Sequence, residues 1–455
     1  MMEVATTVMQ KELPVTSLAQ LSRTLQTILT TVADQAAQAT RLVQRHSKLT
    51  GAKFVQSLVF TWLDQPDATY EDLAQTATAL GVPITGQGLA ARFTPEAAAC
   101  MKQTLEAAVQ EIIAADPVTI PLLQRFHGVY LQDGTTITLP DELARLWSGC
   151  GGRSETGTRA ALKVQVQVNF STGQVTHLDL QAGRAQDKTA PMQTAALPEG
   201  ALRLADLGYF AVSVMAEYAR HGVYTVSRYH PQVLVFTADG EPLALLRRLA
   251  TASRGEFDLP IQLSREHRWP CRLVAVRVPS AVARARRRKA RRQARREGRT
   301  LSAQQLTLLD WTIVVTNVPA ALLSVGELLV MLRLRWQIEL LFKLWKSQGQ
   351  VDESRSHKPY RILCEVYAKL LALLIQHWIL LTCGWQYHNR SLVKAGQTIR
   401  RHGLALGEAL ASLERVGEVL ATIARCLAKG ARLNSRRKAP NTYQLLMACS
   451  EQVLA

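Results

Sequence analysis

The 455-residue sequence lacks the usual marks of secreted, zinc-binding and membrane-spanning proteins. Its seven cysteines form no Cys-x-x-Cys pair and are odd in number, which is typical of reduced thiols in a cytosolic protein. The histidines show no paired spacing for a metal, so we expect no zinc site. The N-terminus lacks the basic and then apolar pattern of a signal peptide. The most apolar run, residues 366–381, contains Lys369, Gln376 and His377 and is short for a bilayer, so we expect a buried helix and no membrane partner.

Acidic residues are scarce beside basic ones. The chain has 36 Asp and Glu against 54 Lys and Arg, which gives a formal net charge of +18 and a pI of about 9.9. The natural partner of such a chain is a polyanion, with nucleic acid first and an anionic membrane surface second. With 47% apolar and 20% charged residues the chain can bury a large core, and its length suits two to four domains of about 150 residues each.

Residues 1–120 are predicted to form a helical region. The segment Tyr70–Gly81 has a helical pattern that ends in glycine, and a second short helix is expected over 85–93. This spacing is typical of a helix-turn-helix, and basic residues upstream of it would then contact DNA phosphates. A plain helical hairpin is the simpler alternative, because Gly86 and Gly88 are poor residues for a recognition helix. The region is therefore a possible DNA end-binding region, with both interpretations open.

Residues 121–230 change to the alternating pattern of β-strands. A strand up to Asp133 is followed by Gly134, which we expect to break it before β-type residues resume. Two further strands complete an antiparallel meander, and a buried strand ending at Asp206, a helix and another strand follow. This succession is the element order of a ribonuclease-H-like sheet. The predicted strands are residues 128–133, 135–139, 162–170, 175–180, 202–206 and 223–227.

Residues 231–310 interrupt that order with short β candidates and one very basic segment. Ten of the sixteen residues from 284 to 299 are Lys or Arg, and the alanines between them favour a helix. Such a run can be a solubilising arm, but its charge density favours a helix that binds DNA phosphates. The residues that we expect to bind DNA there are Arg286, Arg287, Arg288, Arg291 and Arg292.

The last core strand and a long helix are predicted within residues 311–355. The helix runs from Val325 to about Gln348. One strip of it, about 80° wide, carries a carboxylate and three cations, namely Arg335, Glu339, Lys343 and Lys346. A salt-bridge ladder on a solvated face is the simple explanation of this strip. Residues 356–455 are predicted to be helical again and are a possible dimerisation region.

Two aspartates supply the further carboxylates that a catalytic role for this strip would need. Cleavage of a phosphodiester requires an activated water or hydroxyl and charge relief on the phosphate, which two Mg²⁺ ions bound to carboxylates provide. A ribonuclease-H-like site has ligands on the first strand, at the end of the fourth strand and on a later helix, where this chain has Asp133, Asp206 and Glu339. Each aspartate alone can instead belong to a turn, since Asp133 precedes Gly134. Asp187, after the third strand, is either an accessory carboxylate or a turn residue.

The motifs around these carboxylates resemble one known family. Asp133-Gly-Thr, Ala205-Asp206-Leu-Gly-Tyr-Phe and Arg335-x3-Glu339-x6-Lys346 resemble the Asp-Asp-Glu cut-and-paste transposases of bacterial insertion sequences. The specific group is the one marked by Tyr-x2-Arg-x3-Glu-x6-Lys, and the resemblance spans roughly residues 30 to 380. Leu332 replaces the Tyr of that motif, and Leu207 stands where the second block usually has Arg. Neither change removes a metal ligand, but the first leaves open whether a hairpin intermediate forms.

The pattern and the resemblance together predict an α/β protein. Its ribonuclease-H-like catalytic core carries a β-rich, basic insertion and is flanked by helical N- and C-terminal regions. The resemblance implies excision and strand transfer of the element with two Mg²⁺ ions, or Mn²⁺ as a substitute, held by Asp133, Asp206 and Glu339. It also implies that Arg335, Lys343 and Lys346 hold end phosphates, and that an aromatic residue such as Trp269 stacks on a DNA base.

The implied partners are double-stranded DNA, as terminal inverted repeats and as target, and a second copy of the chain in the synaptic complex. The implied location is the bacterial cytoplasm, at the nucleoid. Three alternatives stay open: a transposase-derived repressor without catalysis, an RNA-binding protein whose basic helix folds on RNA, and a related nuclease without strand transfer. Metal-dependent cleavage would argue against the first, and a preference for structured RNA would support the second.

Overall fold

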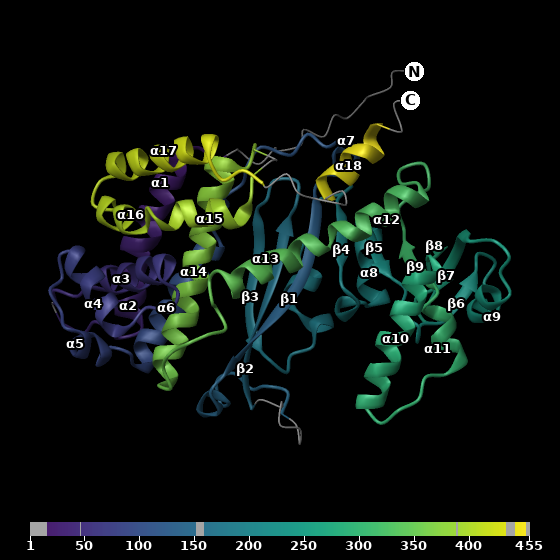
Figure 1. The fold of residues 1–455 in the computed structure, drawn as a ribbon, viewed down its shortest axis with the longest axis horizontal. Helices are drawn as coiled ribbons and strands as arrows, with labels where there is room; N and C mark the ends of the chain where they lie inside the picture. Colours follow the sequence, from purple (N-terminus) through teal and green to yellow (C-terminus); the bar gives the residue numbers. More distant parts are fainter. Residues whose placement is uncertain (1–15, 46, 152–158, 388–389, 434–441, 452–455) are drawn as a thin grey trace, which may run out of the picture.

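The computed structural model describes residues 16–45, 47–151, 159–387, 390–433 and 442–451, and its fold is mixed α/β. Figure 1 shows a central sheet with a helical part on one side and a smaller α/β part on the other. The helical part combines segments from both ends of the chain, whereas the smaller part comes from its middle. The signal-peptide prediction concerns the N-terminal residues 1–15, which lie outside the described ranges.

Nine strands of the described residues form one sheet, in the order β3-β2-β1-β4-β5-β9-β8-β7-β6. The first three strands along the chain are antiparallel neighbours, and β4 and β5 continue the sheet beside β1 as parallel strands. The predicted meander followed by parallel strands is therefore confirmed. The strands are β1 (Val129–Leu139), β2 (Ala160–Asn169), β3 (Val175–Ala182), β4 (Leu202–Ala205), β5 (Tyr224–Arg228), β6 (Val235–Thr237), β7 (Glu256–Leu263), β8 (Trp269–Arg277) and β9 (Trp311–Thr316).

Strand β1 continues through Gly134, so the predicted break at this glycine is wrong. Gly134 pairs with Gln165 of β2 in an unbroken register. A Cβ atom on Gly134 would meet the carboxamide of Gln165 and the hydroxyl of Tyr209. The glycine thus allows two side chains to approach the backbone closely, and Asp133 lies inside a strand instead of a turn.

The insertion extends the core sheet. Its strand β8 pairs with β9, and β7 and β6 follow toward the edge. The basic segment forms the predicted helix α10 (Ser280–Arg296), which ends just before Gly298 with its positive φ of 64°. Trp269 is only 2% exposed and packs in the insertion's own core, so it offers no face to a DNA base. The other helices here are α9 (Leu245–Ala250) and α11 (Ala303–Leu308).

Helices from both ends of the chain pack around the long helix α14 (Pro359–Gly384), which contacts α3, α6 and α17. The predicted helix at Tyr70 is α4 (Tyr70–Ala79), and the short α5 (Gly86–Ala90) follows it. The other helices of this part are α1 (Leu18–Thr27), the π-helical η1 (Ile28–Val32), α2 (Ala33–Ala39), α3 (Gly51–Asp64), α6 (Pro95–Val109), α15 (Leu392–Arg400), α16 (Gly403–Ala409) and α17 (Leu413–Lys429).

Helix α14 is longer than the apolar run that marks it in the sequence. By length and composition it could cross a membrane, so the prediction that the segment is too short is wrong. The protein nevertheless buries 78% of its most apolar window. A helix buried to this extent is a core helix of the protein. This agrees with the buried helix that the charged and polar residues of the run predicted.

The helix predicted over 325–348 consists of two helices, α12 (Val325–Leu334) and α13 (Trp336–Ser347), which meet at Arg335. An apolar strip beside the charged one docks α13 onto the core, where Ile338 and Trp345 are buried. Helix α13 crosses the sheet and contacts β1 (Figure 1). The remaining helices are α7 (Pro121–Gln124), α8 (Val212–Arg220) and α18 (Thr442–Glu451), with short 3₁₀ turns at Asp141–Leu143, Asp187–Thr189, Pro191–Thr194 and Leu207–Tyr209.

Candidate active site

Three carboxylates from three separate elements meet around one guanidinium group. Arg335 Nη1 lies 3.3 Å from Asp133 Oδ2. Arg335 Nη2 lies 3.7 Å from Asp206 Oδ1 and 2.5 Å from Glu339 Oε1. The structure therefore brings together the three carboxylates that the sequence analysis selects, although they are far apart along the chain.

Strand pairing and one helix crossing position these side chains. Strands β1 and β4 are parallel neighbours, with Gln132 opposite Ala205. The next residue on each strand is an aspartate, so Asp133 and Asp206 lie at the same level of the sheet. Glu339 comes from α13, four residues after Arg335, and the two side chains share one face of the helix.

The cluster is buried at Asp133 and open at the other two carboxylates. The side chain of Asp133 is 17% exposed, whereas those of Glu339 and Asp206 are 33% and 47% exposed. Burial raises the pKa of Asp133 to about 6 from an ordinary value near 3.8, and the neighbouring carboxylates add to this effect although the Gly134 N–H and Arg335 oppose it. Three carboxylates share one guanidinium, so the ionised cluster carries an excess of negative charge.

The donor set suits a hard divalent cation. Carboxylate oxygens are the ligands that Mg²⁺ and Mn²⁺ prefer in proteins. Within the described ranges, no group of three His, Cys, Asp or Glu is already spaced to hold a metal ion, and the guanidinium of Arg335 lies between the carboxylates instead. The cluster therefore has the right chemistry for such an ion, but Arg335 would have to move aside before one ion could contact all three groups.

A network of polar side chains supports the turn that follows β4. Tyr209 donates its hydroxyl proton to Gln165 of β2, and Gln165 Nε2 donates to Asp187 Oδ1 at 3.0 Å. Lys163 Nζ pairs with the same oxygen at 2.9 Å, and the Asp187 carboxylate packs against Gly208. Asp187 thus has protein partners and holds the turn that carries Asp206. The buried glutamine in the alternating strand β2 was the sequence signal for this network, and it was missed.

The two lysines of the predicted strip differ in their surroundings. Lys346 Nζ donates to the carbonyl of Thr136 at 3.0 Å and lies 3.5 Å from Asp352 Oδ2, so it fastens the end of α13 to β1. Lys343 is exposed and forms no ion pair with a carboxylate in the described part of the chain. Lys343 is therefore available to a ligand, whereas Arg335 and Lys346 are held by the protein.

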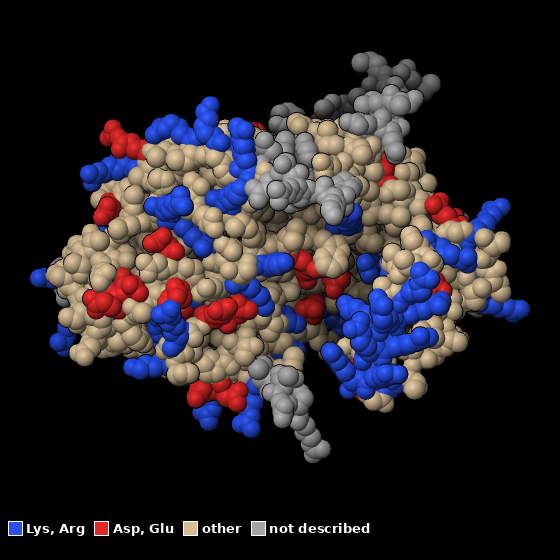
Figure 2. All heavy atoms as spheres, viewed as in Figure 1, with Lys and Arg blue, Asp and Glu red and all other residues tan. Residues whose placement is uncertain are grey.

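The basic helix α10 lies on the same face as the carboxylates. Figure 2 shows acidic side chains near the middle of this face and a dense group of Lys and Arg over α10 beside them. Two of the arginines that we expected to bind DNA are engaged in the protein: Arg286 donates to the Trp311 carbonyl at 3.0 Å, and Arg287 pairs with Asp310. The exposed cations of α10 are Arg284, Arg288, Lys289, Arg291, Arg292, Arg295 and Arg296.

Residues 124–375, more than half of the chain, match the family model of the transposase DDE domain. The chain belongs to this family. The matched residues run from the end of α7 into α14 and include all three carboxylates and the basic insertion. The protein is therefore a DNA transposase.

Its curated relatives are transposases of bacterial insertion sequences. The chain is 24% identical over 367 residues to the transposase for insertion sequence element IS231F of Bacillus thuringiensis subsp. israelensis, which covers 75% of this chain and 76% of the relative. It is 23% identical over 375 residues to the transposase for IS1151 of Clostridium perfringens, which covers 77% and 78%. The solved piggyBac transposase synaptic complex with hairpin DNA gives a TM-score of 0.48 at 7% identity, over 93% of this chain and 87% of that chain. The predicted resemblance to insertion-sequence transposases is confirmed.

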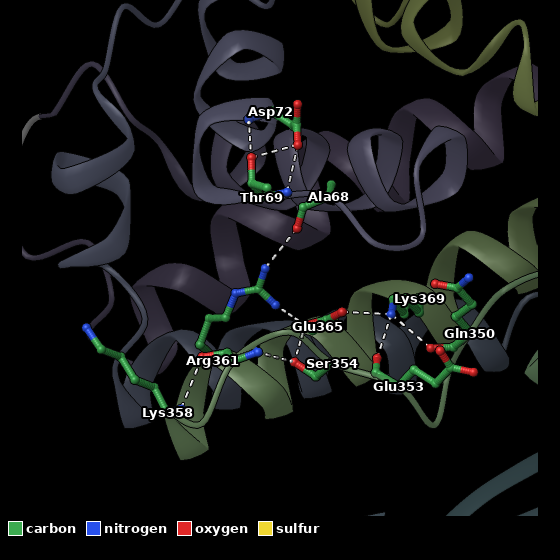
Figure 3. A network of polar contacts seen from close by, with 11 residues as sticks. Ala68, Thr69, Asp72, Gln350, Glu353, Ser354, Lys358, Arg361, Glu365 and Lys369 are labelled. Atoms are coloured by element: carbon green, nitrogen blue, oxygen red, sulfur yellow. Dashed lines mark hydrogen bonds and ion pairs between the residues drawn. The ribbon is translucent and has the colours of Figure 1, made fainter.

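The transposase contains a second cluster of charges, which the sequence analysis missed. On α14, Glu365 pairs with Arg361 and with Lys369, and all three side chains are at most 3% exposed (Figure 3). The signal was present in the sequence as three charged residues spaced four apart on an apolar helix.

This α14 cluster joins two distant parts of the transposase. Lys369 Nζ donates to the carbonyls of Gln350 and Glu353 at 2.8 and 2.9 Å, in the loop that follows α13. Arg361 Nη2 donates to the carbonyl of Ala68 at 3.1 Å, between α3 and α4 (Figure 3). The loop also holds the Asp352 that pairs with Lys346. The cluster therefore fixes the end of the helix that carries Glu339 against the N-terminal helices.

Proposed function

We propose that this transposase cleaves and joins DNA strands at Asp133, Asp206 and Glu339, with divalent metal ions as cofactors. The convergence of these three carboxylates from β1, the end of β4 and α13 is the observation that carries the proposal. The strand order β3-β2-β1-β4-β5, with an antiparallel meander followed by parallel strands, supports a ribonuclease-H-like core. In such a core these three carboxylates would be the metal ligands.

The carboxylates fit two Mg²⁺ ions, or Mn²⁺ in their place, which when bound would supply an activated water or hydroxyl and charge relief at the phosphate. The chain's own groups fix the site for that chemistry. The Gly134 N–H donates to Asp133 Oδ1 at 2.8 Å and holds this carboxylate, and a pKa of about 6 leaves it mostly ionised at neutral pH. The partly exposed Asp206 and Glu339 would face the incoming DNA. The same site would release the element ends and then transfer a 3′-hydroxyl to target DNA.

Exposed cations beside the site would bind the DNA backbone. Seven Lys and Arg of α10 are exposed, and none of them forms an ion pair within the described residues. Such a row releases counterions when it contacts phosphates, which is the main source of affinity for DNA. Lys343 would contact a phosphate next to Glu339. We propose that terminal inverted repeats and target DNA reach the carboxylates across this surface.

The regions of the chain would divide these tasks. Residues 1–120 would bind the element ends, 121–230 and 311–355 would form the catalytic core, and 231–310 would supply the basic insertion. Residues 356–455 would contribute to dimerisation, because two element ends must be held together in one synaptic complex. The transposase would act in the bacterial cytoplasm, on the DNA of the nucleoid.

Cleavage of a plasmid that carries the DNA flanking this gene tests the proposal. With Mg²⁺, the wild type is expected to cut both strands at the boundaries of the element. Glu339→Gln is expected to lower the rate by at least about a thousandfold, and EDTA to abolish cleavage. Glu217→Gln is a matched control, because this exposed glutamate of α8 pairs with Arg220 away from the cluster.

Three outcomes would contradict the proposal. Cleavage that persists in Glu339→Gln would place the active site elsewhere. Tight DNA binding by the wild type without any cleavage would instead favour a transposase-derived repressor. Boundary cleavage without joining to target DNA would favour a nuclease that lacks strand transfer.

A further inference from the structure

Arg335 contacts every carboxylate of the site and contacts them from the centre. Its side chain is 9% exposed, and its Nη1 and Nη2 atoms are engaged with Asp133, Asp206 and Glu339. Arg335 is the single residue between α12 and α13 and has helical dihedrals (φ −50°, ψ −33°), so helical backbone and not a loop places its side chain. The ring of Trp336 lies 5.6 Å from its guanidinium carbon and closes one side.

A guanidinium in this position competes with divalent cations for the same oxygens. The carboxylate atoms that accept its N–H groups are the atoms that a hard cation needs. A positive charge within 4 Å also opposes the entry of another one. The arrangement therefore holds the three carboxylates together in the free protein and, at the same time, weakens their affinity for metal.

A DNA phosphate is the group that can draw Arg335 away. Arginine pairs with phosphate oxygens through two parallel N–H donors, as it does with carboxylates. The carboxylates beside it are partly exposed, and the cations of α10 lie on the same face (Figure 2), so DNA bound there would bring phosphates close to the guanidinium. Loss of the guanidinium from the centre would leave three carboxylates without a counter-ion.

We propose that Arg335 is an exchangeable counter-ion that couples DNA binding to metal loading. In the free transposase it occupies the centre of the carboxylates. When DNA binds, it moves to a phosphate and the carboxylates take up divalent cations. The inference rests on the proposed function, because it needs Asp133, Asp206 and Glu339 to be metal ligands. Coupling of this kind is reciprocal, so metal would also raise the affinity for DNA by the same factor.

Titration of the full-length protein with Mn²⁺, followed by the electron paramagnetic resonance of the free ion, tests the proposal without any cleavage assay. Without DNA, Arg335→Gln is expected to bind Mn²⁺ at least about tenfold more tightly than the wild type. Lys343→Gln is the matched control, because it removes one positive charge from the same strip without removing a carboxylate contact; we expect a change below about threefold. A short duplex of the DNA that borders the gene should raise the Mn²⁺ affinity of the wild type about tenfold or more and that of Arg335→Gln much less.

Arg335→Lys is a second test variant, for the case that Arg335→Gln does not fold. Lysine keeps the charge but has no planar fork to span three carboxylates, so its Mn²⁺ affinity should lie between the wild type and Arg335→Gln. The inference is wrong if Arg335→Gln binds Mn²⁺ no more tightly than Lys343→Gln does. If the glutamine variant does not fold, Arg335→Lys takes its place in this comparison. Loss of Mn²⁺ binding in Glu339→Gln would show that the Mn²⁺ bound by the wild type lies at the site that contains Glu339. If Glu339→Gln binds Mn²⁺ as the wild type does, the proposed metal site fails, and that failure is distinguishable from failure of the coupling.

Discussion

Two arginine–glutamate pairs with the same four-residue spacing, Arg335–Glu339 and Arg361–Glu365, have opposite surroundings in this transposase. The first pair is open, since 33% of the Glu339 side chain is exposed and two aspartates contact the same guanidinium. The second pair is closed, since neither side chain is more than 3% exposed and the further partner is a cation, Lys369. The open cluster thus has three carboxylates for one cation, and the closed cluster has two cations for one carboxylate.

This difference separates a ligand site from a structural cluster. In the closed cluster the surplus positive charge is met inside the protein by backbone carbonyls of the neighbouring segments. Buried charges persist only when such partners satisfy them. In the open cluster the surplus is negative and partly exposed, so it is accessible to a cation from outside the chain. Charge balance and exposure, and not the spacing of the pair, therefore distinguish the candidate catalytic glutamate from the structural one.

The largest expected effect comes from Glu365→Gln. This change leaves Arg361 and Lys369 buried without their carboxylate, and breaking a buried ion pair on one side costs about 3–5 kcal/mol of unfolding free energy. Urea unfolding followed by circular dichroism measures the loss. The double variant Glu365→Gln, Lys369→Met should recover part of it, because one unpaired charge is removed. A loss below about 1 kcal/mol in the single variant would mean that the closed cluster is not structural.

The next effect concerns Asp133 and depends on pH. Its pKa is raised in the folded protein to about 6, so the protonated carboxyl favours the folded state and this contribution disappears as the pH rises through 6. Asp133→Asn resembles the protonated form at every pH. In EDTA the variant should exceed the stability of the wild type by about 1–3 kcal/mol above pH 7 and by only about a third of that at pH 4.5, because the unfolded carboxyl, with an ordinary pKa near 3.8, is still partly protonated there. Unfolding midpoints across this range measure it, and a stability difference that is the same at both ends would contradict the raised pKa.

The carboxylates of the open cluster could be predicted from the sequence only because its strands and helices follow the element order of a ribonuclease-H-like sheet. Alternation in the strand at 162–170 and the order of strands and helices allowed Asp133 and Asp206 to be placed at neighbouring strand positions. Glu339 was selected because its motif resembles a family, since the pair at Arg361 has the same local spacing. Spacing along one helix cannot report which face meets other carboxylates and which is enclosed by the core.

Other features depended on contacts that a single sequence does not contain. Gly134 has the sequence of a break, yet the side chains packed against it make it part of β1. The helix predicted through Arg335 is divided there into α12 and α13, although Arg335 keeps helical dihedrals (φ −50°, ψ −33°). Arg286 and Arg287 looked equivalent to their neighbours, but contacts with β9 and Asp310 hold them in the protein.

Adjacent arginines of α10 extend the comparison to charges that bind DNA. Arg287 pairs with Asp310, whereas Arg288 is exposed and has no ion-pair partner among the described residues. Arg288→Gln should weaken DNA binding about two- to fivefold and lower the salt dependence of log K by about 0.9, the value of one phosphate contact. Arg287→Gln should change the salt dependence less, because its charge is already compensated. Fluorescence anisotropy over a series of salt concentrations measures both, and equal slopes for the two variants would show that internal pairing does not decide which arginines bind DNA.

The smallest expected effect is that of Glu339→Gln on stability, and it is the counterpart of the change at Glu365. The substitution removes one attraction to Arg335 but also removes repulsion from two neighbouring carboxylates, in a side chain that is one-third exposed. The two terms oppose each other, so the unfolding free energy in EDTA at neutral pH should change by less than about 0.5 kcal/mol. Urea unfolding under the conditions used for Glu365→Gln measures it. A loss as large as that of Glu365→Gln would make Glu339 a structural residue as well, and the contrast between an open and a closed cluster would no longer identify the site.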